Sequence, residues 1–176
     1  MNINLQLFAE AVQGKRIVHM FRLASKETSA AGKAFPFVTE AGRTKSADAD
    51  SVATKDGSLR TPAPVETEIN ITAIMSTEND AINELEDAMD ANALIQLWEA
   101  NLDTPASGSG SNKYEGYYFE GYLTSFEVTA NAEDHAEIAM TFGINGSGKR
   151  GDVTVPQTEQ ITSSYSFKDT VQKSGV

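Results

Sequence analysis

Residues 114–144, YEGYYFEGYLTSFEVTANAEDHAEIAMTFGI, decide the fold class because they hold two alternating runs joined by a short polar turn. The second run, His135–Ile144, is apolar at every other position, which is the pattern of a strand with one buried face. The first run, Tyr114–Thr129, is aromatic, and Gly121 within it suggests a bulge. One face of this first run is expected to hold Tyr118, Tyr122, Phe126 and Val128. With Asn131–Asp134 as the turn, the two runs predict a β-hairpin.

Further strands are predicted upstream of this hairpin. Ile17–Leu23 alternates, and Glu66–Met75 alternates clearly between apolar and polar residues. Ala34–Thr39 is another candidate, and Pro36 would place it at a sheet edge or a strand start. Leu94–Ala100 fits a helix or a strand equally well, because a short apolar run does not separate the two periods.

One helix is predicted at residues 77–90. Thr77 suits the N-cap position, with Asp80 three residues later as in a capping box. Ile82, Leu85 and Met89 recur at helical spacing and give one apolar stripe. The acidic residues between them are expected to face water as a solvated surface: Glu84, Glu86, Asp87 and Asp90.

A long polar arm is predicted between the early strands. Residues 42–60 are polar and contain Asp56-Gly57, the dipeptide that a two-residue type I′ hairpin prefers. Short strands at 50–55 and 58–61 would flank this turn, and Thr61–Pro64 would end them. Residues 104–112 are expected to form a flexible loop and Gly143–Gly151 a glycine-rich turn.

Composition excludes several classes of function. The chain has 176 residues, a formal net charge of −11 and no cysteine. The acidity disfavours tight binding to phosphate backbones or anionic membranes, and it would let nucleic acid slide past. The lack of cysteine removes disulfides and thiolate sites. We see no signal peptide and no apolar run long enough to span a membrane, so membrane insertion is not expected.

The combined pattern predicts a mainly β protein with about seven strands and one flanking α-helix, arranged as a sandwich or barrel. Three segments are expected. Residues 1–14 form an N-terminal extended segment, residues 15–156 form the β domain, and residues 157–176 form a C-terminal extension whose aromatic anchors are Tyr165 and Phe167.

Two short motifs are similar to known binding motifs, but the residues around them do not support a binding function. Gly143–Lys149 matches most of a phosphate-binding loop, but Arg150 replaces the magnesium-binding hydroxyl, and the residues that follow are not a helix start. Arg150–Asp152 is the tripeptide that some adhesion receptors read, but three residues recur often by chance. A glycine-rich turn is the preferred interpretation of this segment.

Other candidate chemistry is equally sparse. His19 and His135 lie far apart in sequence and lack the spacing of a zinc site. Asn131–Asp134 and Ser46–Asp50 lack the spaced carboxylates of a dedicated calcium loop. Trp98 and the aromatic residues at 117–122 suit a core or an interface better than a ligand platform. We therefore expect no cofactor, no metal and no enzymatic activity.

The order of these features resembles the major tail proteins, or tail-tube subunits, of long-tailed bacteriophages with non-contractile tails. The features that carry the resemblance are the Thr54–Thr61 hairpin within an arm, the strand leading into the capped acidic helix, Leu94–Trp98, and the two strands of the long hairpin with its glycine turn. The Lys-Asp-Gly hairpin is the most specific of them. The match covers roughly residues 15–156.

The resemblance implies a β-sandwich whose hexameric rings stack into a tube that conducts DNA during ejection. Sheets of neighbouring subunits would join into an inner barrel, and the arm and both termini would reach adjacent subunits or rings. The implied partners are further copies of the chain together with tape measure, terminator and baseplate proteins. The implied location is the virion tail, assembled in the host bacterial cytoplasm. The candidate contact residues are Arg43, Lys45, Lys55, Asp56, Gly57, Ser58, Tyr165 and Phe167.

Two alternatives from other classes stay open at this point. A carbohydrate- or receptor-binding β-sandwich would use the aromatic strand as its platform and would remain a small oligomer. A tail terminator or secretion-tube subunit would form rings that do not stack indefinitely.

Overall fold

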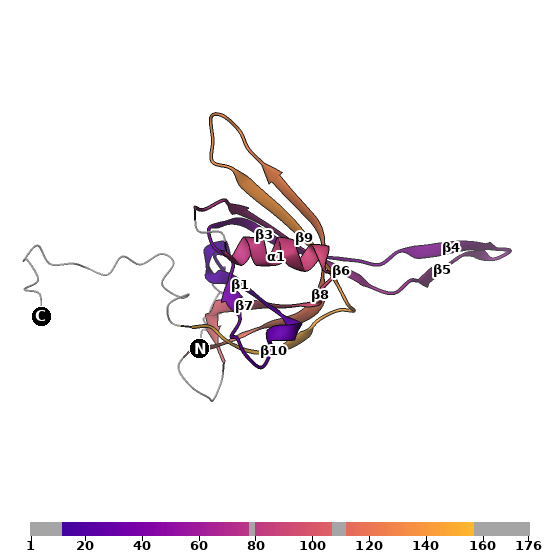
Figure 1. The fold of residues 1–176 in the computed structure, drawn as a ribbon. Coiled ribbons are helices and arrows are strands. Elements are labelled where there is room, and N and C mark those ends of the chain that lie inside the picture. Colours follow the sequence, from indigo (N-terminus) through magenta and orange to yellow (C-terminus); the bar gives the residue numbers. More distant parts are fainter. Residues whose placement is uncertain (1–11, 78–79, 107–111, 157–176) are drawn as a thin grey trace, which may run out of the picture.

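The computed structural model describes residues 12–77, 80–106 and 112–156, which form ten strands and one α-helix (Figure 1). The fold is mainly β with one flanking helix, as predicted. The strands are β1 Ile17–Leu23, β2 Lys33–Ala34, β3 Val38–Ser46, β4 Ala49–Thr54, β5 Gly57–Pro62, β6 Glu66–Ile74, β7 Ile95–Pro105, β8 Lys113–Thr129, β9 Glu137–Ile144 and β10 Lys149–Thr154. The helix is α1 Asp80–Asp90, and 3-10 turns lie at Gly14–Arg16 and Ala24–Lys26.

Strand β8 belongs to two half-sheets. Its first half pairs with β7 on one side, from Tyr114 to Gly121, and with β10 on the other, from Lys113 to Tyr118. Its second half, from Gly121 onward, pairs with β9. The antiparallel order β2-β1-β7-β8-β9-β6-β3 therefore divides at Gly121 into a β1/β7/β10 half and a β3/β6/β9 half.

The sheet curls strongly. Its two outermost strands, β2 and β3, are consecutive in the chain and are separated by Phe35–Phe37 alone. Four residue steps span at most about 14 Å, whereas seven strands laid flat would place their edges about 29 Å apart. The two edges must therefore approach each other, which gives the barrel-like form that the sequence predicted.

The main core lies inside this curl. Phe21, Leu97 and Phe119 from one half-sheet meet Ile71 and Phe142 from the other, and all five are buried. Strand β1 alternates between two environments, because Phe21 enters this core and Met20 enters a second cluster on the other side of the sheet. The second cluster is made of Met20, Ala100, Leu102, Val153 and Val155.

Helix α1 packs on the main core through Ile82, Leu85 and Ala88. Its C-terminus is capped by Asn92, whose φ is 49°, with the Asn92 and Ala93 N–H groups bonded to the Met89 and Ala88 carbonyls. This is the Schellman arrangement, and Asn tolerates the left-handed conformation that it needs. The predicted first turn at residues 78–79 lies outside the described residues.

One helix carboxylate departs from the prediction of a solvated face. Glu84 is only 14% exposed, and its two oxygens each lie 2.8 Å from a lysine Nζ, those of Lys26 and Lys33. Burial raises the pKa of Glu84, but the hydrogen bonds and charges of the two lysines outweigh this effect, so the pKa lies below its usual value. The prediction was wrong for Glu84 because Lys26, between β1 and β2, and Lys33, at the start of β2, both reach this carboxylate.

The face assignment on β8 was also wrong. Phe119, Gly121 and Leu123 are the buried residues, while Tyr122 is exposed. The register shifts between Leu123 and Ser125, so the bulge lies at Thr124 instead of at Gly121. This bulge reverses the alternation and turns Phe126 toward the core, which explains why one unbroken period failed to describe the strand.

Two boundaries also differ from the prediction, and one open assignment is settled. The candidate strand Ala34–Thr39 is split between β2 and β3, because Phe37 adopts a φ of 49°. The segment Leu94–Ala100, which fitted a helix or a strand equally well, is a strand in the structure, and β7 begins at Ile95. The glycine-rich turn is shorter than expected, because Lys149 already begins β10. No helix in the described part of the chain has the length and hydropathy to cross a membrane.

We predict that Gly121→Ala destabilises the subunit by about 1–3 kcal/mol, the usual cost of overpacking. A Cβ at Gly121 would stand 2.2 Å from the Gly143 carbonyl oxygen, which is backbone and has little room to move. Gly42→Ala is the matched control, because nothing lies within 4 Å of its Cβ position. Urea denaturation of the unassembled chain measures both, and equal stability of the two variants would contradict the prediction.

A second prediction concerns Glu84. A carboxylate whose folded pKa is depressed stabilises above its unfolded pKa, and this contribution is lost as the pH falls through the folded value. We expect Glu84→Gln to lower stability at pH 7 by about 1 kcal/mol and to reduce the loss of stability on acidification below the ordinary glutamate pKa. Thermal melting from pH 7 to pH 3 tests this. Exposed Glu86→Gln on the same helix is the control, and identical profiles for the two variants would refute the prediction.

Candidate assembly surfaces

The half-sheet β8-β9-β6-β3 ends in an unpaired edge on each side. Strand β3 pairs with β6 only, and β8 beyond Gly121 pairs with β9 only, within the described ranges. Both edges are long, because β3 has 9 residues and 8 residues of β8 pair with β9. Unpaired strands of this length are templates for pairing with another chain.

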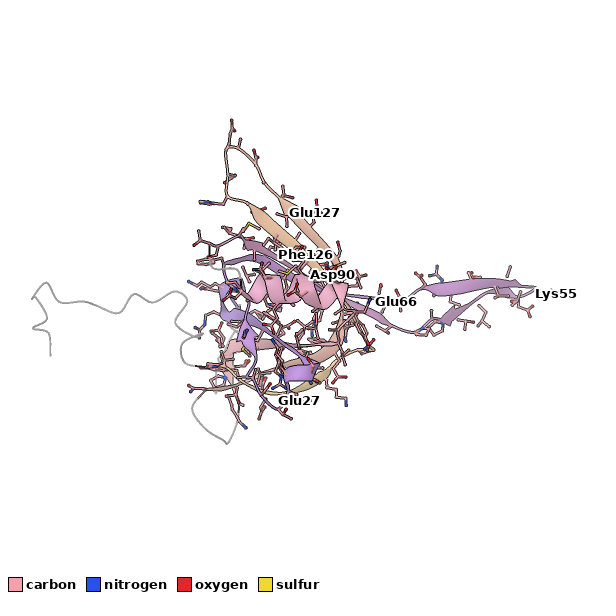
Figure 2. The ribbon with its side chains drawn as sticks, in the orientation of Figure 1. Glu27, Lys55, Glu66, Asp90, Phe126 and Glu127 are labelled. Carbon is pink, nitrogen blue, oxygen red and sulfur yellow. The ribbon has the colours of Figure 1, made fainter. Side chains whose placement is uncertain are left out.

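The outward face of this half-sheet is polar, and its only charged residues are acidic. Five glutamates lie on it, and all of them are exposed: Glu40, Glu66, Glu68, Glu127 and Glu137. Figure 2 labels Glu127 on the projecting β8–β9 hairpin and Glu66 where β6 begins. Small polar residues fill the middle, where the Thr141 hydroxyl donates to Asn70 Oδ1 at 2.8 Å. No lysine or arginine stands at an outward position of these four strands.

The predicted arm is a separate two-stranded hairpin of β4 and β5 that projects from the body (Figure 1). Its turn differs from the prediction. Thr54 pairs with Gly57, so the two turn residues are Lys55 and Asp56, neither of which has a positive φ. The positive φ of 141° falls on Gly57, so the turn is not type I′. The candidate residues Lys55, Asp56, Gly57 and Ser58 lie together and exposed at the tip.

The arm is also shorter than predicted. Residues 42–46 belong to β3 and pair with β6. Two candidate contact residues in this stretch therefore make contacts inside the subunit. Lys45 Nζ donates to the Ser147 carbonyl at 2.9 Å, and Arg43 lies against Glu99 on β7. Their role between subunits remains a prediction, as does that of Tyr165 and Phe167, which lie outside the described residues.

Arg43 connects the two half-sheets. Its Nη2 lies 3.5 Å from Glu99 on β7, and its guanidinium carbon lies 4.0 Å from the centre of the Tyr117 ring on β8. His19 Nε2 is 3.7 Å from the other Glu99 oxygen. Burial raises the pKa of Glu99, but the His19 hydrogen bond and the Arg43 charge bring it below its usual value. The cluster is therefore an internal brace across the barrel.

The remaining sequence motifs are structural. Gly146 and Gly148 adopt φ values of 75° and 72° in the turn between β9 and β10, and a strand follows them instead of a helix. This turn lacks the helix N-terminus that a phosphate loop requires. Arg150 of the Arg-Gly-Asp tripeptide donates to the Tyr117 hydroxyl at 2.8 Å. Nowhere among the described residues do three His, Cys, Asp or Glu side chains gather around a possible metal position.

Trp98 and Tyr118 are half-buried on the sheet face opposite α1, with ring centres 5.5 Å apart. Arg22 lies over the Trp98 ring at 5.2 Å, and Gln96 receives two bonds from Arg22 and donates one to the Tyr118 hydroxyl. Burial and the neighbouring Glu120 raise the pKa of Tyr118 to about 12. These polar groups satisfy one another, as expected for packing rather than for a ligand platform.

The surfaces that the sequence analysis missed are the two free sheet edges and the acidic face between them. The face could have been found, because Glu66 and Glu68 alternate with the buried residues of β6. The edges could not, because they depend on where β8 changes partners.

Comparisons with known proteins agree with this architecture. The family model described as "Phage tail tube protein" matches residues 11–150. A protein of Staphylococcus phage phiMR25, described as "Putative tail protein", is 33% identical over 156 residues, which is 87% of this chain and 80% of that relative.

Solved structures share the fold at low identity. The SPP1 tail tube has a TM-score of 0.69 at 17% identity and covers 94% of this chain and 95% of its own. The tail of a gene transfer agent particle has a TM-score of 0.60 at 11% identity and covers 79% of this chain and 98% of its own. With the family match over most of its length, the chain belongs to the phage tail tube protein family and is a structural component of the virion tail.

Proposed function

We propose that this chain assembles into stacked hexameric rings that form a tail tube for the passage of DNA. The observation that carries the proposal is the half-sheet β8-β9-β6-β3, which has a free edge on each side and a polar face free of cations. Pairing β3 of one copy with the second half of β8 of the next would continue the sheet around a ring. The gene transfer agent tail, which shares this fold, has C6 symmetry.

The acidic face would then line the channel. Glu40, Glu66, Glu68, Glu127 and Glu137 would repel the phosphates of DNA, so DNA would pass without binding. The opposite face of the half-sheet is covered by its own core, which leaves the polar face as the one suited to a water-filled channel.

Other tail proteins complete the proposal. The tube would meet tape measure, terminator and baseplate proteins at its ends and in its channel, and it would assemble in the host bacterial cytoplasm. The fold itself recurs in the tube terminator of a contractile injection system, with a TM-score of 0.55 at 12% identity. Family membership favours this function over the carbohydrate- or receptor-binding alternative.

The first test is negative-stain electron microscopy of the purified chain at low and high concentration. We expect rings and tubes with a central hole. Deleting Lys55–Ser58 is expected to leave the melting temperature unchanged and to reduce tube formation, because the arm does not touch the core. Particles of one small size at every concentration would contradict the proposal that the chain forms tubes. Normal tubes from the deletion variant would show that the arm tip is not needed for assembly.

The channel assignment has its own test. Glu68→Lys combined with Glu127→Lys is expected to leave tubes intact and to make them retain short duplex DNA, because lysines in the channel would bind phosphates. Glu86→Lys with Asp87→Lys gives the same charge change on exposed helix positions and should retain none. Co-sedimentation of labelled DNA with assembled tubes measures the difference. Equal retention of DNA by both variants would show that the acidic face does not line the channel.

A further inference from the structure

The two free edges of the half-sheet β8-β9-β6-β3 can meet in only one direction. Each neighbouring pair of strands in this half-sheet is antiparallel, so β3 runs opposite to the second half of β8. In a cyclic ring every copy has the same orientation along the ring axis. The β3 edge of one copy therefore meets the β8 edge of the next as an antiparallel pair, and only the register of this pair is left to determine.

The edge that β8 offers to a neighbour has a sharp limit at Gly121. This residue pairs with Ile144 of β9 on one side and with Ile95 of β7 on the other. Because β7 and the incoming strand would lie on the same side of β8, the new pairing can begin only at Tyr122. It can continue as far as Thr129, where β8 ends.

The regular part of β3 has the same length as this free edge. The register of β3 with β6 shifts just before Glu40, so the uninterrupted ladder is Glu40–Ser46, which ends where the strand ends. On β8, Thr124 is bulged and has no partner of its own on β9. Without this bulged residue, Tyr122–Thr129 offers the same number of positions as Glu40–Ser46. The two edges therefore fit each other end to end in one register.

Other registers create conflicts or lose pairs. Rows of the sheet continued straight into the next copy would place Lys45 opposite Gly121, where Ile95 is already the partner. They would also place Glu40 directly opposite Glu127, and like charges in that position are destabilising. Moving β3 by two residues, about 7 Å, toward the tip of the β8–β9 hairpin removes both conflicts. A larger shift would move Glu40 beyond the end of β8.

This shift also keeps each face of the sheet continuous from one copy to the next. A shift by one residue would exchange the core side and the polar side of the incoming strand. With the two-residue shift, Glu127 stands opposite Gly42 on the polar face, where nothing in the subunit lies within 4 Å of a Cβ position at Gly42. On the core side, Val128, which is 49% exposed, stands opposite Ala41. A closed barrel requires such a stagger, because its strands tilt relative to the axis.

Resting on the proposed function, we propose that the rings close in one defined register, in which Glu40–Ser46 of one copy pairs with Tyr122–Thr129 of the next and Gly42 faces Glu127. Gly42 is then the residue that separates the glutamates of neighbouring copies, because a charged side chain at this position would face Glu127 directly. The same stagger, repeated at every boundary between subunits, sets the tilt of the strands in the channel wall.

Engineered cysteines test the register directly, because the chain has none of its own. Gly42→Cys with Glu127→Cys should link neighbouring chains when assembled tubes are oxidised, since directly opposite residues lie within the Cα separation of about 7 Å that a disulfide allows. Glu40→Cys with Glu127→Cys reports the register without a shift, and Thr44→Cys with Glu127→Cys reports a larger shift. Both should give much less linked product on denaturing electrophoresis. A dominant product from either of these pairs, or tubes in which no pair is linked, would overturn the proposal.

A charge test decides the question if the cysteine variants do not assemble. Gly42→Glu should raise the concentration needed for tube formation by about two- to fivefold, the usual effect of like charges directly opposite each other across strands. Glu127→Gln should reverse this effect, but it should reverse the effect of the matched control Thr44→Glu much less, because Thr44 faces Ser125 in this register. An unchanged concentration for Gly42→Glu, or equal reversal in both backgrounds, would overturn the register. A native chain that forms no tubes would instead refute the proposed function itself.

Discussion

The change of partners along β8 is the constraint on which the rest of the structure depends. A strand of 17 residues is about 57 Å long, too long for neighbours on one flat sheet within a domain of this size. Its first half therefore lies between β7 and β10, and its second half pairs with β9 alone. At the changeover, Gly121 pairs with both Ile95 and Ile144, where a side chain would collide with the Gly143 carbonyl. The two half-sheets can then enclose one core.

The same change of partners creates the surfaces suited to assembly. Since β7 leaves β8 at Gly121, the second half of β8 has a free edge, and β3 supplies the other at the far side of the half-sheet. Soluble proteins usually protect such edges, because they promote aggregation. Here the face between them carries five glutamates, so like charges accumulate when copies pair. In the proposed ring, edge hydrogen bonds must outweigh this repulsion, which salt would weaken.

The sequence predicted the parts of this fold that follow one regular period. Strands β6 and β9 and helix α1 have clear periodicity, and most of their core residues were identified because burial follows that period. Strand β1 also alternates in sequence, but it is buried on both faces at His19–Phe21. The predicted set of residues on one face of β8 was wrong. The bulge at Thr124 exchanges the two faces of the strand, and no residue type in the sequence indicates it. Glu84 was also misread as a solvated carboxylate, and the contacts of Arg43 inside the subunit were not predicted. The partners of these two residues, Lys26, Lys33 and Glu99, are distant in sequence. A periodic pattern within one element therefore does not predict these contacts.

The internal use of Arg43 bears on how the subunit separates folding from assembly. Arg43 is held by Glu99 and by the faces of Tyr117 and Phe119, and one of its nitrogens is buried without a hydrogen-bond partner. These contacts connect β3 to β7 and β8 within the subunit, although the unpaired nitrogen offsets part of the free energy that they supply. Because β3 is held by these contacts before assembly, pairing its edge with another strand, as proposed, would cost less conformational entropy. Among the described residues the arm has no such brace, because β4 and β5 pair only with each other. In the proposed assembly, backbone pairing of the braced β3 edge would therefore close the ring, whereas the arm would contribute a segment that the barrel does not hold in place.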